Sequence, residues 1–162
     1  MIYYYFGSKE QLYVEVLEKL YGDIRSTENR LHLDELPPEL AIRRLVEFTF
    51  DHHDHNVDFV RIVSIENIHN AEYVKRSDAI KALNNTILDT LGGILQRGAD
   101  EGLFRRGIDA LDVHLLISSF CFYRVSNRHT LGEIFQIDLP DETIKQRHRE
   151  MICESVLRYL KA

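Results

Sequence analysis

Apolar residues recur along the chain mainly at the three- and four-residue spacing of α-helices, and no strand-like alternation with hairpin turns is seen in the sequence. The first apolar stripe follows Ser8, which together with Gln11 forms the signature of a helix N-cap. That stripe consists of Leu12, Val16, Leu20 and Ile24. The pattern therefore predicts a long helix that begins at about residue 8.

Five further segments carry the same helical pattern. They cover approximately residues 38–55, 57–69, 73–98, 109–127 and 141–161. The three prolines of the chain fall at the breaks between segments and are followed by acidic residues, as is usual where a helix begins. The sequence therefore predicts an all-α protein, an antiparallel helical bundle of about six long helices joined by short loops.

Composition narrows the class of protein. With 162 residues, 44% of them hydrophobic and 28% charged, the chain resembles an ordinary globular protein with one domain and at most a fragment of a second. The net charge of -6 excludes an extended nucleic-acid-coating surface, so any DNA-binding surface must be small or lie partly outside this chain. The sequence shows neither a membrane-spanning run nor a signal peptide, which predicts a cytoplasmic protein without a membrane partner.

The most specific motif is the segment from Tyr3 to Leu12, YYYFGSKEQL. An aromatic run with a Tyr-Tyr-x-Phe core is followed by one spacer residue and then by Ser, Lys, Glu, any residue and Leu. This segment resembles the tetracycline-repressor-like (TetR) family of transcriptional regulators, at the point where the recognition helix of a helix-turn-helix ends and a long connecting helix begins. The expected helix count agrees with the family over the rest of the chain.

The resemblance implies two parts. Residues 1–7 would be a remnant of the N-terminal helix-turn-helix domain, and residues 8–162 a ligand-binding and dimerisation domain. The implied contacts with operator DNA are Tyr3, Tyr4, Tyr5 and Lys9. Tyrosines can reach thymine methyl groups and phosphates, and Lys9 would lie at a helix N-terminus, which favours a phosphate. The helices that support a recognition helix would precede Tyr3, so DNA binding is expected only together with them.

The resemblance further implies a one-component regulator, most simply a repressor, whose operator binding is modulated by a small-molecule effector. The effector would enter a cavity between the connecting helix and the helices that follow, and would change the separation of two recognition helices. The residues expected to line this cavity are Phe48, Phe59, Ile62, Glu66, His69, Leu91, His114, Phe120 and Tyr123. The effector itself is not identified by the sequence, and no cofactor is expected.

A homodimer is expected because the segments at 109–127 and 141–161 are more apolar than the surface helices of a monomer. In the family, such a pair of helices packs against its symmetry mate as a four-helix bundle. The residues expected at the interface are Ser118, Phe122, Ile144, His148, Met151, Ile152, Ser155 and Tyr159. The alternative is that the same stripes fill the core of one subunit.

Two other functions are compatible with parts of the sequence. The cluster from Asp51 to His55 could hold a metal in a helical hydrolase, although histidines also favour the negative end of a helix dipole. Glu66 and His69 have the spacing of a di-iron motif, but such sites need two motifs and the chain has one. A helical interaction module without a ligand is the third alternative. We identify no catalytic residue and no metal site, and we predict that the chain is not an enzyme.

Overall fold

The computed structural model describes residues 7–162, and helices are the regular elements of this part of the chain, apart from one isolated bridge. The α-helices are α2 (Lys9–Asn29), α3 (Pro38–His55), α4 (Val57–Ile68), α5 (Asp78–Asp100), α6 (Ala110–Ser126), α7 (Arg128–Phe135) and α8 (Glu142–Leu160). Two short 3-10 helices, η1 (Leu33–Glu35) and η2 (Val74–Arg76), lie in the connections. The predicted all-α class is confirmed.

The helix boundaries follow local sequence signals. The Ser8 hydroxyl accepts a hydrogen bond from the backbone N–H of Gln11 at 3.1 Å, so α2 begins where the N-cap pattern places it. Ser77 caps α5 in the same way, which moves its start from the expected residue 73 to Asp78. The sequence did not predict α7, because this helix has eight residues and its apolar side chains, Leu131, Ile134 and Phe135, span little more than one turn.

The buried face of α2 differs from the predicted one. Val14, Leu17 and Ile24 are buried, whereas Val16 is 40% exposed. Of the expected stripe, Ile24 is buried and Leu20 is partly buried against the cluster around Phe59, whereas the placement of Val16 is wrong. The difference matters for function, because it turns Arg25 and Glu28 towards the interior.

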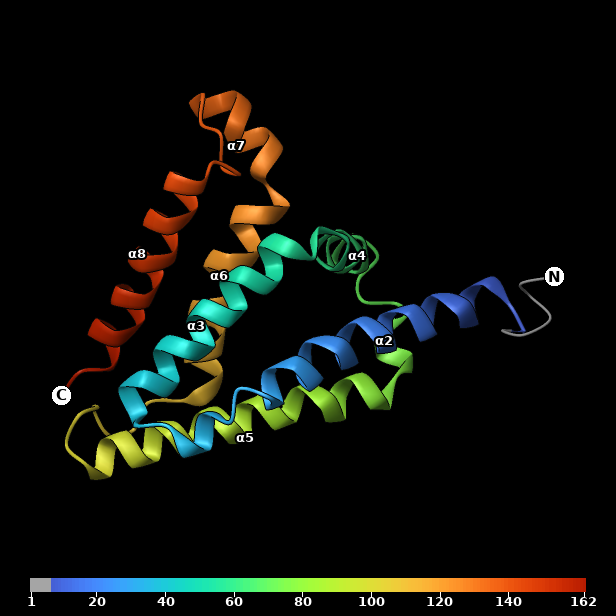
Figure 1. Ribbon diagram of the computed structural model, residues 1–162. Coiled ribbons are helices and arrows are strands. Elements are labelled where there is room, and N and C mark those ends of the chain that lie inside the picture. The colour runs from blue at the N-terminus through green and yellow to red at the C-terminus, as the bar shows by residue number, and fades with distance from the viewer. Residues whose placement is uncertain (1–6) are drawn as a thin grey trace.

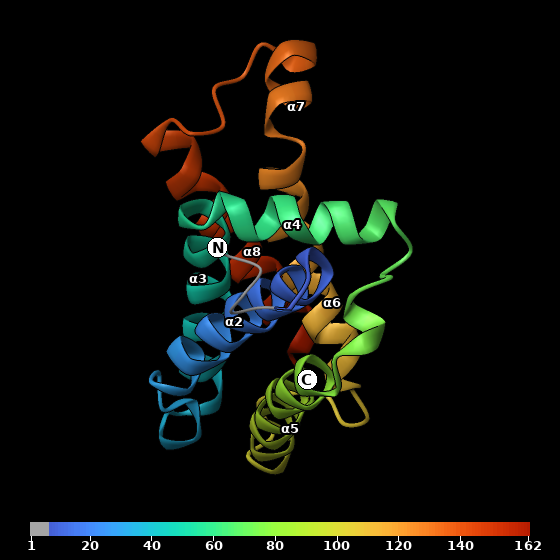
Figure 2. The ribbon, with the colours of Figure 1, turned by 90° about the vertical axis from the view of Figure 1, so that its right-hand side faces the viewer.

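The helices form two groups that meet along one side (Figures 1 and 2). One group contains α3, α6 and α8, which pack on one another, and the other contains α2 lying along α5. Contacts of α5 with α3 and α6 join the groups, and α4 packs across α6. The main core takes side chains from α3, α5, α6 and α8, with Leu91, Ile94, Val113 and Val156 almost fully buried. Within residues 7–162, no helix combines the length and the apolar character needed to cross a bilayer.

A tight turn closes the end of α5. The ring of Phe104 lies against Gly98, where an added Cβ would come within 2.0 Å of Phe104 Cδ2. The carbonyl of Gly98 also accepts hydrogen bonds from the backbone N–H groups of Leu103 and Phe104. Arg105 N–H donates to Leu160 O at 2.8 Å, so this turn also holds the C-terminal end of α8.

Ionic contacts fix α8 and α6 to α3. Arg149 of α8 binds Asp51 through two hydrogen bonds of 3.1 and 3.0 Å. Arg124 of α6 is buried; its Nη1 lies 2.7 Å from Asp54 Oδ1, and its Nη2 donates to the carbonyl of Leu139 at 2.6 Å. Arg124 thus has an intramolecular partner. Both cysteines are free and buried in the core.

Candidate ligand-binding site

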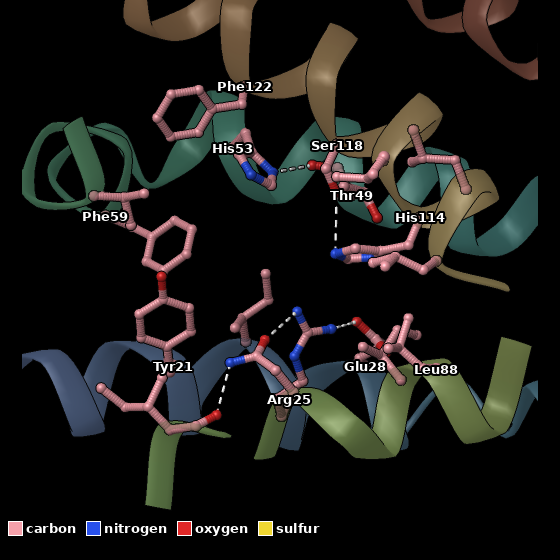
Figure 3. A pocket seen from close by; sticks show the side chains of 18 of the residues that line it. Tyr21, Arg25, Glu28, Thr49, His53, Phe59, Leu88, His114, Ser118 and Phe122 are labelled. Atoms are coloured by element: carbon pink, nitrogen blue, oxygen red, sulfur yellow. Dashed lines mark hydrogen bonds and ion pairs between the residues drawn. The ribbon is translucent and has the colours of Figure 1, made fainter. Parts of the chain in front are cut away.

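A cavity of about 640 Å³ lies between the two groups of helices. One wall comes from α2 and α5, and the other from α3, α4 and α6, as Figure 3 shows. Its volume falls in the usual range for sites that hold small molecules, roughly 300–1,000 Å³. The cavity is open on one side to solvent through exposed residues of α6 such as Leu111 and Leu115.

The wall formed by α2 and α5 carries an ion pair. Arg25 and Glu28 lie one helical turn apart, and Arg25 Nη1 donates to Glu28 Oε2 at 2.5 Å. Arg25 Nη2 donates to the side-chain oxygen of Asn84 on α5 at 3.1 Å. Both charged side chains are more than nine-tenths buried. Charges are rarely buried without a partner or a purpose, because removing them from water costs several kcal/mol per ion.

Burial changes the acid–base properties of this wall. It raises the pKa of Glu28 to about 7, although the charge of Arg25 acts in the opposite direction. It also raises the pKa of the nearby Tyr21 hydroxyl. The carboxyl group of Glu28 can therefore gain or lose a proton near neutral pH when its surroundings change.

The opposite wall carries two histidines. His53 of α3 donates from Nδ1 to the backbone carbonyl of Thr49 at 2.7 Å, which leaves Nε2 as an acceptor. His114 Nε2 lies 3.4 Å from the hydroxyl of Ser118, one turn further along α6. Burial lowers the pKa of both histidines, and the charge of Arg25 acts in the same direction. Both rings are therefore neutral at pH 7 and can orient a ligand by hydrogen bonds.

Apolar side chains form the remaining surface. The rings of Tyr21 and Phe59 meet edge to face, with centroids 5.4 Å apart, and close one end of the cavity. Phe122 lies on the same side, where its ring approaches His53. Leu88 of α5 lies near Glu28, towards the other end of the cavity from Tyr21 and Phe59. A mainly apolar space with a few convergent polar groups is the usual form of a small-molecule site.

The residues predicted to line a cavity are distributed over several places. The structure puts Phe59 and His114 in the wall. Leu91 is fully buried in the core. Phe48 lies beside the ring of His52, Phe120 lies beside that of His148, Ile62 is half-buried on α4, and Tyr123 is 56% exposed.

Glu66 and His69 lie around a separate, smaller hollow near the start of α2. Glu66 is buried, and its Oε2 accepts the backbone N–H groups of Tyr73 and Val74 at 3.1 Å each. Its neighbour Tyr13 has a pKa raised to about 12, first by burial and then by the charge of Glu66. Glu66 thus fixes the turn after α4, while His69 is exposed.

The residues predicted for the dimer interface lie partly in the cavity or the core and partly on the exposed surface. Ser118 and Phe122 line the cavity, and Ile152 is buried within the subunit. Met151, Ser155 and Tyr159 form an exposed stripe on α8, and Ile144 and His148 are half-buried near the beginning of that helix. Leu111, Leu115 and Tyr123 form a parallel exposed stripe on α6.

Of the predicted DNA contacts, Lys9 lies within the described residues, in the first turn of α2. Tyr3, Tyr4 and Tyr5 fall outside the described residues. Lys9 is exposed in the first turn of α2, beside the Ser8 cap. Lys9 therefore lies at an accessible helix N-terminus, where backbone N–H groups favour the binding of an anion.

The histidine cluster on α3 does not have the arrangement of a metal centre. Asp51 pairs with Arg149, and Asp54 pairs with Arg124 and Lys145. His53 faces the cavity instead. Among residues 7–162, no three histidine, cysteine or acidic side chains are grouped so that they could hold a metal ion.

Sequence reasoning did not find the polar wall formed by Arg25, Glu28 and Asn84. A signal existed, since Leu17, Tyr21, Ile24 and Glu28 continue one face at four- and three-residue spacing. A charged pair is normally assigned to a solvated helix face, which is why this continuation was not recognised. Thr49 also lines the cavity, and the sequence analysis did not predict it.

Comparison with known proteins gives a consistent result. The family model for the tetracyclin repressor-like C-terminal domain matches residues 38–156. The chain is 38% identical over 161 residues to the HTH-type transcriptional repressor NicS of Pseudomonas putida KT2440, covering 99% of this chain and 76% of that protein. The crystal structure of SCO4942 from Streptomyces coelicolor, proposed to be a transcriptional regulator, is similar with a TM-score of 0.67 at 21% identity. That likeness covers 98% of this chain and 78% of the other.

Proposed function

The chain belongs to the tetracycline-repressor-like (TetR) family of transcriptional regulators, and we propose that it acts as a repressor whose hold on operator DNA is set by a small molecule in the cavity beside α2. It is a regulator rather than an enzyme, as its relatives are. A transcriptional regulator must reach its operator DNA, which supports a cytoplasmic location.

The observation that carries the proposal is the cavity itself. It brings polar groups from opposite walls, Arg25 and Glu28 on α2 and His53 and Ser118 on the far side, around one mainly apolar space. Such groups give a ligand its orientation and specificity, while the apolar surface supplies affinity. The pairing of Asp51 and Asp54 with arginines removes the support for a metal-dependent hydrolase.

The position of α2 links the cavity to DNA. This helix begins at Ser8, next to the proposed DNA contacts, and reaches the cavity wall with Tyr21 and Arg25. A ligand held between α2 and α6 would favour one position of α2 over another. It can shift the equilibrium only by the difference between its affinities for the two positions.

The DNA-binding end remains part of the proposal. We assign residues 1–7 to the end of a helix-turn-helix domain, with Tyr3, Tyr4, Tyr5 and Lys9 as contacts, and residues 8–162 to the sensing and dimerising domain. The family implies both operator DNA and a dimer as partners. The motif at Tyr3–Leu12 supports the assignment of these DNA contacts. Binding to DNA would also require the helices that precede a recognition helix.

We assign the dimer interface to the exposed stripes on α6 and α8. Two neighbouring helices that expose Leu115, Tyr123, Met151 and Tyr159 form an apolar surface of the kind that covers itself across a two-fold axis. Four helices, two from each subunit, would then meet there.

The proposal is tested by filling the cavity. The probe is 2-naphthamide, a neutral aromatic amide that fits an apolar space with a few polar groups. Leu88→Trp fills the cavity from α5, and Thr86→Trp, an exposed position two residues earlier that does not line it, is the matched control. Calorimetric titration should give saturable binding to wild type and Thr86→Trp, and at least about tenfold weaker binding to Leu88→Trp. Equal binding to all three proteins, or none to wild type, would overturn the proposal.

A further inference from the structure

The guanidinium of Arg25, a residue of the cavity wall, has a donor without a partner. Its side chain is only 7% exposed, yet Nε has no hydrogen-bond partner in the described part of the protein. Nη1 and Nη2 are held by Glu28 and Asn84. A buried donor without a partner loses its hydration without compensation, which costs about 1–3 kcal/mol. A ligand atom that accepts this hydrogen bond would remove that cost.

The second buried arginine with a free Nε provides a contrast. Arg124 also leaves Nε without a partner, but it is enclosed between Asp54, Leu139 and the ring of Phe50, and it does not line the cavity. Of these two side chains, only Arg25 lines a space large enough for a small molecule.

The charges around the cavity limit what this donor can bind. The basic side chains in the wall are Arg25, Lys81, His53 and His114. Lys81 is more than half exposed and bound to Asp78 at 2.9 Å, and both histidines are neutral at pH 7 because burial lowers their pKa. One buried positive charge therefore faces the ligand, which suits a monoanion. A phosphate dianion would need more than one.

We propose that the cavity selects small molecules with an apolar body and a single carboxylate, and that Arg25 Nε binds the carboxylate. This inference rests on the proposed function of the cavity. A guanidinium presents Nε and an adjacent Nη as a planar fork that matches the two oxygens of a carboxylate. The apolar body would lie between Leu88 and the rings of Tyr21 and Phe59.

Glu28 does not prevent a second carboxylate from binding. Burial has raised its pKa to about 7, so the approach of another negative charge favours its protonated form. Protonated Glu28 still accepts from Arg25 through its carbonyl oxygen. The buried charge then stays balanced, with the ligand carboxylate in place of the carboxylate of Glu28.

The test compares two probes of the same shape. 2-Naphthoate carries the carboxylate, and 2-naphthamide replaces it with a neutral amide. Because the chain contains no tryptophan, naphthalene fluorescence can be followed with little protein background. Wild type should bind naphthoate at least about tenfold more tightly than naphthamide. In Arg25→Met, naphthoate binding should weaken at least about tenfold, while naphthamide binding stays within about twofold.

If Arg25→Met does not fold, the ratio of naphthoate to naphthamide binding in wild type still tests the preference for a carboxylate. Arg25→Lys, which keeps the charge, should retain part of this preference. Equal binding of the two probes to wild type would overturn the carboxylate inference, as would an unchanged ratio in a folded Arg25→Met protein. If Leu88→Trp nevertheless blocks both probes in calorimetric titration, which its added tryptophan does not disturb, the cavity remains the ligand site and only the inferred carboxylate selectivity is wrong. If Leu88→Trp blocks neither probe, the proposed function fails as well.

Discussion

Arg25 and Glu28 form an ion pair, with 2.5 Å between Nη1 and Oε2, in the wall of the cavity and on the helix that begins next to the proposed DNA contacts. Buried ion pairs are seldom a source of net stability, because desolvation offsets most of the Coulomb attraction. Here the pair is placed where a ligand would meet it. Its position on α2 is therefore better explained by ligand binding than by folding.

Glu28→Gln should change how stability depends on pH. The pKa of Glu28 is raised from 4.5 to about 7 in the folded protein. A raised carboxyl pKa favours folding below pH 4.5, and this contribution is lost as the pH rises from 4.5 to 7. Glutamine does not titrate, so between these values the variant should gain stability relative to wild type, by about 3 kcal/mol in total. Urea unfolding at several pH values measures the difference.

Comparing the variant with wild type removes the contribution of the histidines, because both proteins retain them. A free-energy difference that stays constant between pH 4.5 and 7 would show that Glu28 ionises as it does in an unfolded chain.

Gly98→Ala should destabilise the closure at the end of α5. The new methyl group would meet the buried Phe104 ring, which cannot move without opening the core. We expect a loss of about 2 kcal/mol. Gly93→Ala, in the same helix with nothing within 4 Å of the added carbon, is the control and should gain up to about 1 kcal/mol. Thermal unfolding followed by circular dichroism compares them, and equal melting temperatures would refute the packing argument.

Asp54→Asn should destabilise the junction of α3, α6 and α8. It removes the negative charge beside Arg124, whose side chain is 5% exposed. We expect a loss of about 2–3 kcal/mol, since a buried charge is left without its counterion. Asp23→Asn breaks the exposed pair with Lys19 and should change the free energy of unfolding by less than about 1 kcal/mol. Denaturant titration of both variants makes the comparison, and a similar small change in each would contradict the assignment.

Met151→Asp should dissociate the dimer. The change places a charge in the exposed apolar stripe of α8, which we assign to the two-fold interface. Gln146→Asp, at an exposed position of the same helix outside this stripe, should leave the dimer intact. Light scattering after size-exclusion chromatography gives the masses. A dimer that survives in Met151→Asp at micromolar concentration would place the interface elsewhere.

Much of the fold could be predicted from the sequence, because a helix with one apolar face has apolar residues at three- and four-residue spacing. The N-cap at Ser8 and the start of α3 at Pro38 lie where local chemistry places them. By contrast, the apolar residues of α7 span little more than one turn, which is too short to identify a helix from spacing. The buried face of α2 was only partly predicted for a different reason, since several apolar stripes are compatible with its sequence and tertiary packing selects among them.

The cavity was harder to predict than the fold. In a sequence, aromatic residues of a cavity cannot be distinguished from aromatic residues of the core. Phe59 was therefore predicted correctly to line the cavity, whereas Phe48 and Phe120 were predicted to line it and do not. Its charged residues resemble surface residues, which concealed Arg25 and Glu28. Only the three-dimensional structure shows that these two kinds of residue share one space.

The most direct test of the account measures whether a bound ligand moves α2. Spin labels on Gln11→Cys, an exposed position near the start of α2, report the separation of the two helices in a dimer by pulsed electron spin resonance. The native thiols should not react, because burial raises the pKa of Cys121 to about 12 and that of Cys153 to about 11. Saturation with 2-naphthoate should shift the distance by about 2 Å or more. An unchanged distance distribution in protein shown to be saturated would contradict the proposed coupling between the cavity and the proposed DNA contacts.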